Sequence, residues 1–318
     1  MASGSVISDD GSNVEQAMEL VDLRGFIRHQ ILYAAAEIGL FDTLDEEYTS
    51  VDDVAESTDL DPSHLYRLLR AMTVYGVVSE DEHRGFALTP VGACFQSSHP
   101  NSVAGSVGFL FHPDHLAVWS HLPDIVEEGG PNGFVREYGH DPWTHLAEND
   151  TLGEAFNELQ TQNSLRESPQ VLDALASYDF SRFDEVCDVG GGHGHLLASL
   201  LEAHPHLEGR VLEVPEVVAE PEQHWAPEME VDERCEYLAG DVFDSVPPAD
   251  GYVLKHILHG WDDDDCVTVL SNVRDAAPPT GRVFVVENVV PPPGVPHWAK
   301  PSDINMMTAT SGQIGRAS

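Results

Sequence analysis

Apolar positions along the first third of the chain recur mainly at helical spacing. Over residues 14–40 they return every three or four positions, which predicts a long helix. Residues 50–57 and 61–75 begin with a capping Ser or Asp and have the same spacing. Two short β-prone runs around a charged turn follow at 77–89. Helix, short helix, longer helix and hairpin together predict a winged helix.

Later in the chain the pattern changes to short apolar runs that alternate with helical segments. Such alternation predicts the α/β class, with a parallel, doubly wound, Rossmann-like sheet. On such sheets ligands bind beyond the carboxyl ends of the strands. The predicted strands cover residues 185–189, 210–214, 235–239, 251–254 and 282–288. The predicted parts of the chain are a disordered tail (1–13), the winged helix (14–100), an aromatic-rich helical linker (101–180) and the α/β domain (181–318).

The first strand of that domain runs into a glycine-rich turn. Asp188 precedes three alternating glycines, and the next strand carries an acid, Glu213, near its end. Strand, glycine turn, helix and acid-bearing strand are typical of a nucleotide cradle, in which the acid binds ribose hydroxyls. His195 stands where a dinucleotide fingerprint needs its third glycine, which disfavours an NAD-dependent oxidoreductase. The glycines are Gly190, Gly192 and Gly194.

The acid before the glycines also bears on the kind of ligand. Asp188 would repel a pyrophosphate but would favour a cation, such as the sulfonium and ammonium groups of S-adenosylmethionine. The alternative is that the glycine turn serves only compact packing.

The formal charge of −40, from 55 acidic and 15 basic residues, narrows the possible partners. It disfavours DNA, RNA and anionic membranes, and it is typical of a cytoplasmic protein from a high-salt cell. Arg67 and Arg70 would lie on the second helix of the winged-helix pair, but the acidic residues around them would repel phosphate, so we expect dimerisation rather than DNA binding. The scattered four cysteines argue against a metal site or a disulfide framework. We expect no signal peptide and no membrane span.

The Asp-x-Gly-x-Gly-x-Gly stretch resembles the first motif of class I S-adenosylmethionine-dependent methyltransferases. The N-terminal part is similar to the dimerisation domain of the plant-type and bacterial O-methyltransferases, the group of the caffeate and hydroxyneurosporene enzymes. Residues 101–180 resemble the linker of that family, which helps wall the acceptor pocket. The resemblance implies a homodimer that moves a methyl group from S-adenosylmethionine to a hydroxyl of a small aromatic or polyene molecule. A non-catalytic cofactor-binding or dimerising relic, a DNA-binding regulator and an oxidoreductase are the alternatives.

A phenol titrates near pH 10 and an imidazole near 6.5, so a loop histidine beside the acceptor is a plausible general base. The segment after strand 251–254 resembles the Lys-x-x-x-His-x-Trp motif of the family, with Gly260 where Asp is common. By this resemblance His259 is the base, and Glu287 holds its ring. The implied cofactor residues are Asp188, Gly190, Gly192, Gly194, Glu213, Asp241, Val242 and Lys255. Trp143, Phe156 and Met306 are candidates for the acceptor pocket, and the acids at 262–265 are predicted to cap a helix rather than bind metal.

The resemblance runs from about Val21 to Met307 and then stops. The family continues with a glycine turn, a helix and two closing strands, and a second glutamate beside the catalytic histidine lies there. We therefore expect a truncated sheet whose strand 282–288 is an exposed apolar edge, which is an aggregation hazard. We also expect an acceptor pocket that lacks part of one wall.

Overall fold

The computed structural model describes residues 19–21 and 23–316 of the chain. It divides into two compact units, of which the first ends at Phe111 and the second begins at His112. The predicted tail at residues 1–13 and the start of the predicted first helix lie outside the described residues. No helix in the described ranges is both long enough and apolar enough to cross a membrane.

The first unit contains the predicted short helices and hairpin. Ser50 accepts the backbone N–H of Asp53, and Asp61 accepts those of Ser63 and His64, so each side chain caps a helix. A cap of this kind stabilises a helix by about 1 kcal/mol. The elements are α2 (Leu23–Glu37), α3 (Leu40–Thr43), α4 (Val51–Thr58), α5 (Pro62–Thr73), α6 (Pro90–Ala93), α7 (Ala104–Leu110) and an antiparallel sheet of order β1 (Thr49–Ser50), β3 (Gly85–Leu88), β2 (Val78–Glu80).

The second unit opens with helices. The longest, α12 (Asp150–Leu175), begins at the Asn149 cap and runs along the sheet, where it packs against α13. Side chains near the start of α12 line the cavity described below, whereas Val171 and Leu172 near its end pack against the hydrophobic core. The preceding helices are α8 (Pro113–Val118), η1 (Trp119–His121), α9 (Leu122–Glu128), α10 (Gly133–Tyr138) and α11 (Pro142–Glu148).

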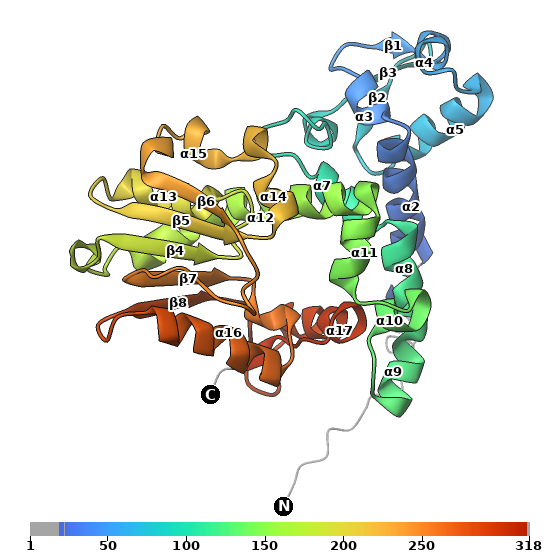
Figure 1. Cartoon of the computed structure of the whole chain (residues 1–318). Helices are drawn as coiled ribbons and strands as arrows, with labels where there is room; N and C mark the ends of the chain where they lie inside the picture. Colours follow the sequence, from blue (N-terminus) through green and yellow to red (C-terminus); the bar gives the residue numbers. More distant parts are fainter. Residues whose placement is uncertain (1–18, 22, 317–318) are drawn as a thin grey trace, which may run out of the picture. The chain divides into compact units, whose positions relative to one another are not determined.

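A five-stranded parallel sheet forms the centre of this unit, which confirms the predicted α/β fold (Figure 1). Alternate side chains point to opposite faces. Val186 and Val211 pack with α13 (His195–Ala203) on one face, and Cys187 and Leu212 pack with α16 (Asp263–Ala276) on the other. The sheet is therefore doubly wound. Its order is β6 (Cys235–Ala239), β5 (Glu208–Glu213), β4 (Glu185–Val189), β7 (Gly251–Lys255), β8 (Arg282–Val286).

Strand β8 is an edge of this sheet in the described part of the chain. Its only partner there is β7, and Val283 and Val285 are 42% and 50% exposed. The exposed apolar edge expected from the sequence is therefore present. The remaining elements are η2 (Phe180–Arg182), α14 (Pro215–Val218), η3 (Pro221–Gln223), α15 (Trp225–Glu228), η4 (Asp232–Arg234), η5 (Leu258–Gly260), α17 (Ala299–Ala309), and the parallel pair β9 (Val289–Val290) and β10 (Gly315–Arg316).

Candidate active site

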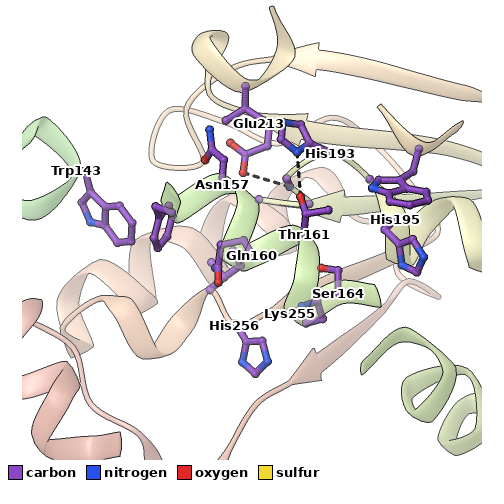
Figure 2. A pocket seen from close by; sticks show the side chains of 18 residues that line it. Trp143, Asn157, Gln160, Thr161, Ser164, His193, His195, Glu213, Lys255 and His256 are labelled. Atoms are coloured by element: carbon purple, nitrogen blue, oxygen red, sulfur yellow. Dashed lines mark hydrogen bonds between the residues drawn. The ribbon is translucent and has the colours of Figure 1, made fainter. Parts of the chain in front are cut away.

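A cavity of about 670 Å³, including its open mouth, lies where β4, β5 and β7 end. This is the carboxyl edge of the sheet, where the sequence predicts the ligand. Figure 2 shows side chains from α12, the glycine turn and the end of β7 arranged around it. The lining residues are Trp143, Phe156, Asn157, Gln160, Thr161, Ser164, Gly190, Gly191, Gly192, His193, Gly194, His195, Glu213, Val217, Trp225, Lys255, His256 and Ile257.

The glycine turn after β4 forms the floor of the cavity. Gly190 has a φ of 67°, and a Cβ there would lie 2.4 Å from the Cδ1 of Ile257, so no side chain fits. Gly192 has a φ of 58°, and no described atom lies within 4 Å of the place its Cβ would occupy. Its backbone N–H is donated to the Oε1 of Glu213 at 3.3 Å. The turn therefore leaves open space above bare backbone.

Two acids flank the turn in different ways. Asp188 is 2% exposed and lies beneath the turn, where its Oδ1 has no hydrogen-bond partner among the described residues. Burial raises the pKa of Asp188 to about 7, against the opposing attraction of Lys255. Glu213 ends β5, lines the cavity, and accepts the N–H groups of Gly192 and Val214; burial raises its pKa as well. An uncompensated buried carboxylate on one side of the turn and a second one in the cavity favour a cationic ligand.

His193, in the glycine turn, makes side-chain contacts that connect the turn to α12 and to Glu220. Its Nδ1 lies 3.1 Å from the Oγ1 of Thr161 on α12 (Figure 2), and its Nε2 lies 3.0 Å from a carboxylate oxygen of Glu220. The linker 101–180, expected to help wall the pocket, includes α12, and Phe156 on α12 is a predicted lining residue. His193 and the polar α12 residues Asn157, Gln160 and Thr161 were not predicted. The polar spacing on α12 carries no signal of which face meets the cavity, because that depends on packing against α13.

A histidine–glutamate pair lies just beyond the end of β7. His259, on η5, follows Ile257 of the cavity lining by two positions, and its Nδ1 is 2.6 Å from the Oε2 of Glu287. The Oε1 of Glu287 accepts the backbone N–H of His259 at 3.3 Å. Burial raises the pKa of Glu287, but the ion-pair contact with His256 and the hydrogen bond with His259 outweigh burial and bring it to about 2. An ionised carboxylate on Nδ1 leaves Nε2 of the ring available as a proton acceptor.

A second set of charges connects this pair to α12. The Oε2 of Glu167 lies 3.3 Å from the Nζ of Lys255 and 2.9 Å from the Nε2 of His256. Within the described ranges, His256, His259 and Glu287 form a group whose ligand atoms all lie within 4.8 Å, which would also suit a metal ion. Since His259 and Glu287 are already joined by a short hydrogen bond, we interpret the group as a proton-handling network.

The structure brings most predicted site residues to this edge of the sheet, but three do not reach the cavity. Asp241, after β6, accepts the N–H of Phe243 at 2.8 Å, Val242 packs in the core on the α16 face, and Met306 is half-buried on α17. Asp188, His259 and Glu287 lie next to the cavity without lining it. Their predicted roles remain predictions. The lining includes Trp143, Phe156, Gly190, Gly192, Gly194, Glu213 and Lys255.

Trp143 explains why glycine stands at position 260. A Cβ at Gly260 would lie 3.3 Å from the Cζ2 of Trp143, which is tighter than ordinary contact. The Trp143 ring also lies 5.3 Å from the ring of Trp261 and meets Phe156 edge-on at 6.0 Å. Trp143 therefore connects the cavity with the loop that carries His259.

Comparisons with known proteins agree with this site. A family profile described as an O-methyltransferase domain matches residues 119–318, and one described as an O-methyltransferase dimerisation domain matches residues 20–98. Phenazine O-methyltransferase PhzM of Lysobacter antibioticus is 31% identical over 92% of this chain and 84% of its own. The 8-amino-8-demethylriboflavin N,N-dimethyltransferase of Streptomyces davaonensis is 33% identical over 89% of this chain and 81% of its own.

A solved structure agrees as well. Human N-acetylserotonin methyltransferase in complex with S-adenosylmethionine superposes with a TM-score of 0.81 at 26% identity, covering 100% of this chain and 90% of that one. Fold and site thus define a cofactor-dependent transferase with a doubly wound sheet. The chain belongs to the O-methyltransferase family, whose cofactor is S-adenosylmethionine.

Proposed function

We propose that this chain transfers a methyl group from S-adenosylmethionine to a hydroxyl of a small aromatic molecule, with His259 as general base. The observation that carries this proposal is the 2.6 Å contact between His259 and Glu287 at the edge of a cavity with a glycine floor. Membership in the O-methyltransferase family supports oxygen as the methylated atom. The flavin-related N,N-dimethyltransferase among the relatives makes an amine the natural second acceptor to test.

The cavity residues suit this cofactor. The open backbone at Gly192 accommodates a ligand without clash, and the Oε atoms of Glu213 can accept ribose hydroxyls in place of their present backbone bonds. Asp188 and Glu213 give the site the negative charge that a sulfonium requires, and Asp241 and Val242 follow the neighbouring strand on the adenine side that we propose. The bound cofactor supplies an already activated methyl group, so the chain's own residues need to position the acceptor and remove its proton.

His259 would take the proton of the acceptor hydroxyl at its Nε2. Glu287 holds the Nδ1–H on the other side of the ring and stabilises the imidazolium that results. Lys255 is held by Glu167 at the cavity wall. Because proton removal is assigned to an imidazole, we expect turnover to be unaffected by EDTA.

The acceptor we propose is flat. Trp143 and Phe156 offer apolar ring surface in the cavity lining, and the Trp143–Trp261 contact extends that surface toward His259. Aromatic side chains stack favourably on aromatic ligands. A relative named for phenazine methylation is consistent with such an acceptor. Met306 on α17 is proposed as a further contact.

We also propose a homodimer that works in a salt-rich cytoplasm. The matched dimerisation domain and the exposed Phe26 and Ile27 on α2 support self-association through the first unit, in which we interpret α4, α5 and the small sheet as a winged helix used for dimerisation. The formal charge of −40 supports function at high ionic strength. A chain that binds the cofactor without turnover is the second candidate, favoured by the bare β8 edge.

The test is release of S-adenosylhomocysteine from S-adenosylmethionine in molar potassium chloride. A hydroxyphenazine, a dihydroxynaphthoic acid and an aromatic amine serve as acceptors. We expect turnover with at least one phenolic acceptor and none in Gly192→Val, whose side chain would enter the cavity. Cofactor binding by calorimetry without turnover of any acceptor would favour the second candidate.

A further inference from the structure

His256 occupies an unusual position between the proposed catalytic pair and α12. Its φ is 58°, so a non-glycine residue adopts the left-handed conformation at the end of β7. Its ring has a carboxylate on each side: Nε2 lies 2.9 Å from the Oε2 of Glu167, and Nδ1 lies 3.5 Å from the Oε2 of Glu287. The side chain is only 15% exposed. The motif spacing that identifies His259 gives no role to this second histidine.

We propose that His256 is a positioning residue that holds the carboxylate of Glu287 against His259 by bridging it to Glu167 on α12. The inference rests on the proposed role of His259 as the base. His256 lines the cavity, but the role assigned to it acts through Glu287 and His259 and not through contact with cofactor or acceptor.

The contacts around Glu287 support this assignment. The Oε2 of Glu287 is hydrogen-bonded to Nδ1 of His259 and also lies 3.5 Å from Nδ1 of His256. Its Oε1 accepts the backbone N–H of His259. A carboxylate that is approached from two sides has less freedom to turn away from His259. In the described residues Nδ1 of His256 has no hydrogen-bond partner of its own, so its ion-pair contact with Glu287 is the interaction available to it.

Charge balance supports it as well. The groups that face His256 are the carboxylates of Glu167 and Glu287, the ammonium of Lys255 and the ring of His259. Burial lowers the pKa of His256, but its contacts with Glu167 and Glu287 outweigh burial and raise it to about 9. Two anions are then matched by the cations Lys255 and His256.

The left-handed backbone at His256 allows closely matched variants. Asn is tolerated at positive φ, and its amide nitrogen corresponds in position to Nδ1. Gln places its amide nitrogen near Nε2. His256→Asn therefore keeps a donor for Glu287, whereas His256→Gln keeps a donor for Glu167. His256→Gly removes both side-chain donors without adding backbone strain, so it tests the loss of both contacts in a chain that should still fold.

The experiment measures kcat, cofactor Kd and the ring tautomer of His259. The tautomer is read by two-bond ¹H–¹⁵N spectra of histidine-labelled full-length protein, assigned with His259→Gln. We expect wild type to show a single Nδ1–H tautomer. We expect His256→Gly and His256→Gln to show mixed tautomers and kcat lowered about tenfold, with an unchanged Kd for S-adenosylmethionine. His256→Asn keeps the donor for Glu287 but loses the anchor on Glu167, so its kcat should fall by only about threefold, less than in the other two variants.

Unchanged kcat and tautomer in a folded His256→Gly would overturn the proposal. So would His256→Gln behaving like wild type while His256→Asn fails, since the contact with Glu167 alone would then matter. A parallel loss of kcat and cofactor affinity would assign His256 a merely structural role, which also contradicts it. Wild-type activity in His259→Gln would instead refute the proposed base, and the tautomer spectra would still report whether His256 orients the ring.

Discussion

His259 and Glu287 lie 28 positions apart in the sequence, yet His259 Nδ1 is 2.6 Å from Glu287 Oε2. One residue follows β7 and the other follows β8, and these strands pair in parallel, so their carboxyl ends meet at the same edge. Glu287 is 13% exposed, and its ion-pair contact with His256 and its hydrogen bond with His259 overcome the effect of burial and bring its pKa to about 2. The pair therefore consists of an ionised carboxylate and an imidazole ring that this carboxylate holds in one orientation, an arrangement suited to proton abstraction.

Glu287→Gln should lower kcat by at least about tenfold, because an amide can hold the ring in the wrong tautomer and does not stabilise an imidazolium. The Kd for S-adenosylmethionine should stay within about twofold, since Glu287 does not line the cavity. Steady-state kinetics and calorimetry measure the two quantities. Asp244→Asn, which removes an exposed carboxylate after β6 that has no assigned role, is the control for the change of charge alone.

Gly260→Asp should disturb the acceptor rather than the cofactor. The new Cβ would lie 3.3 Å from the Cζ2 of Trp143, and relieving such crowding costs about 1–3 kcal/mol. We expect the acceptor KM to rise by about tenfold while the cofactor Kd is unchanged. Trp143→Ala removes the crowded ring. In that background, Gly260→Asp should not raise the acceptor KM above the value of Trp143→Ala alone. A further rise in the double variant would show that Trp143 is not the cause.

The buried carboxyl of Asp188 predicts a pH dependence of stability. Burial raises its pKa from 3.8 to about 7, so between these values the folded chain binds more protons than the unfolded chain. The free energy of unfolding therefore falls as pH rises from about 4 to 7 and stays lowered above that. Asp188→Asn should be more stable than wild type at pH 8, and the difference should shrink toward pH 5. Thermal unfolding without cofactor tests this, and a difference that grows toward low pH would contradict it.

The exposed edge at β8 predicts self-association that a charge can suppress. Val285 is 50% exposed on a strand with a free edge in the described part of the chain. Val285→Lys should reduce concentration-dependent light scattering without changing cofactor Kd, since lysine on an edge strand opposes pairing with another sheet. Val267→Lys, on the exposed surface of α16, is the matched control and should have a smaller effect.

The sequence predicted the parts of the site that depend on local order along the chain. The five strands, the glycine turn and the acid at Glu213 follow from spacing, because each strand end delivers its next residues to one edge of a parallel sheet. The sequence also indicated Phe156 on α12, but not His193 or the polar α12 residues of the lining, whose roles depend on which helical face packs against the sheet. Met306 does not line the cavity, and its contact with the acceptor stays a prediction. The sequence of α17 carries no pattern that distinguishes a pocket residue from a core residue.

His256 illustrates a further limit of sequence reasoning. A histidine in a loop of a chain with 17 histidines carries no signal by itself. Its position between Glu167 and Glu287 depends on a left-handed backbone and on the register of α12, which lies about ninety residues earlier in the chain.

The central claim is that His259 removes the acceptor proton and takes no part in holding the cofactor. The most direct test compares His259→Ala with wild type for methyl transfer to a phenolic acceptor and, by calorimetry, for binding of S-adenosylmethionine. We predict that turnover falls by about 10²-fold or more while the cofactor Kd changes by less than about twofold. Equal losses of turnover and cofactor affinity, or turnover that survives the substitution, would contradict the account.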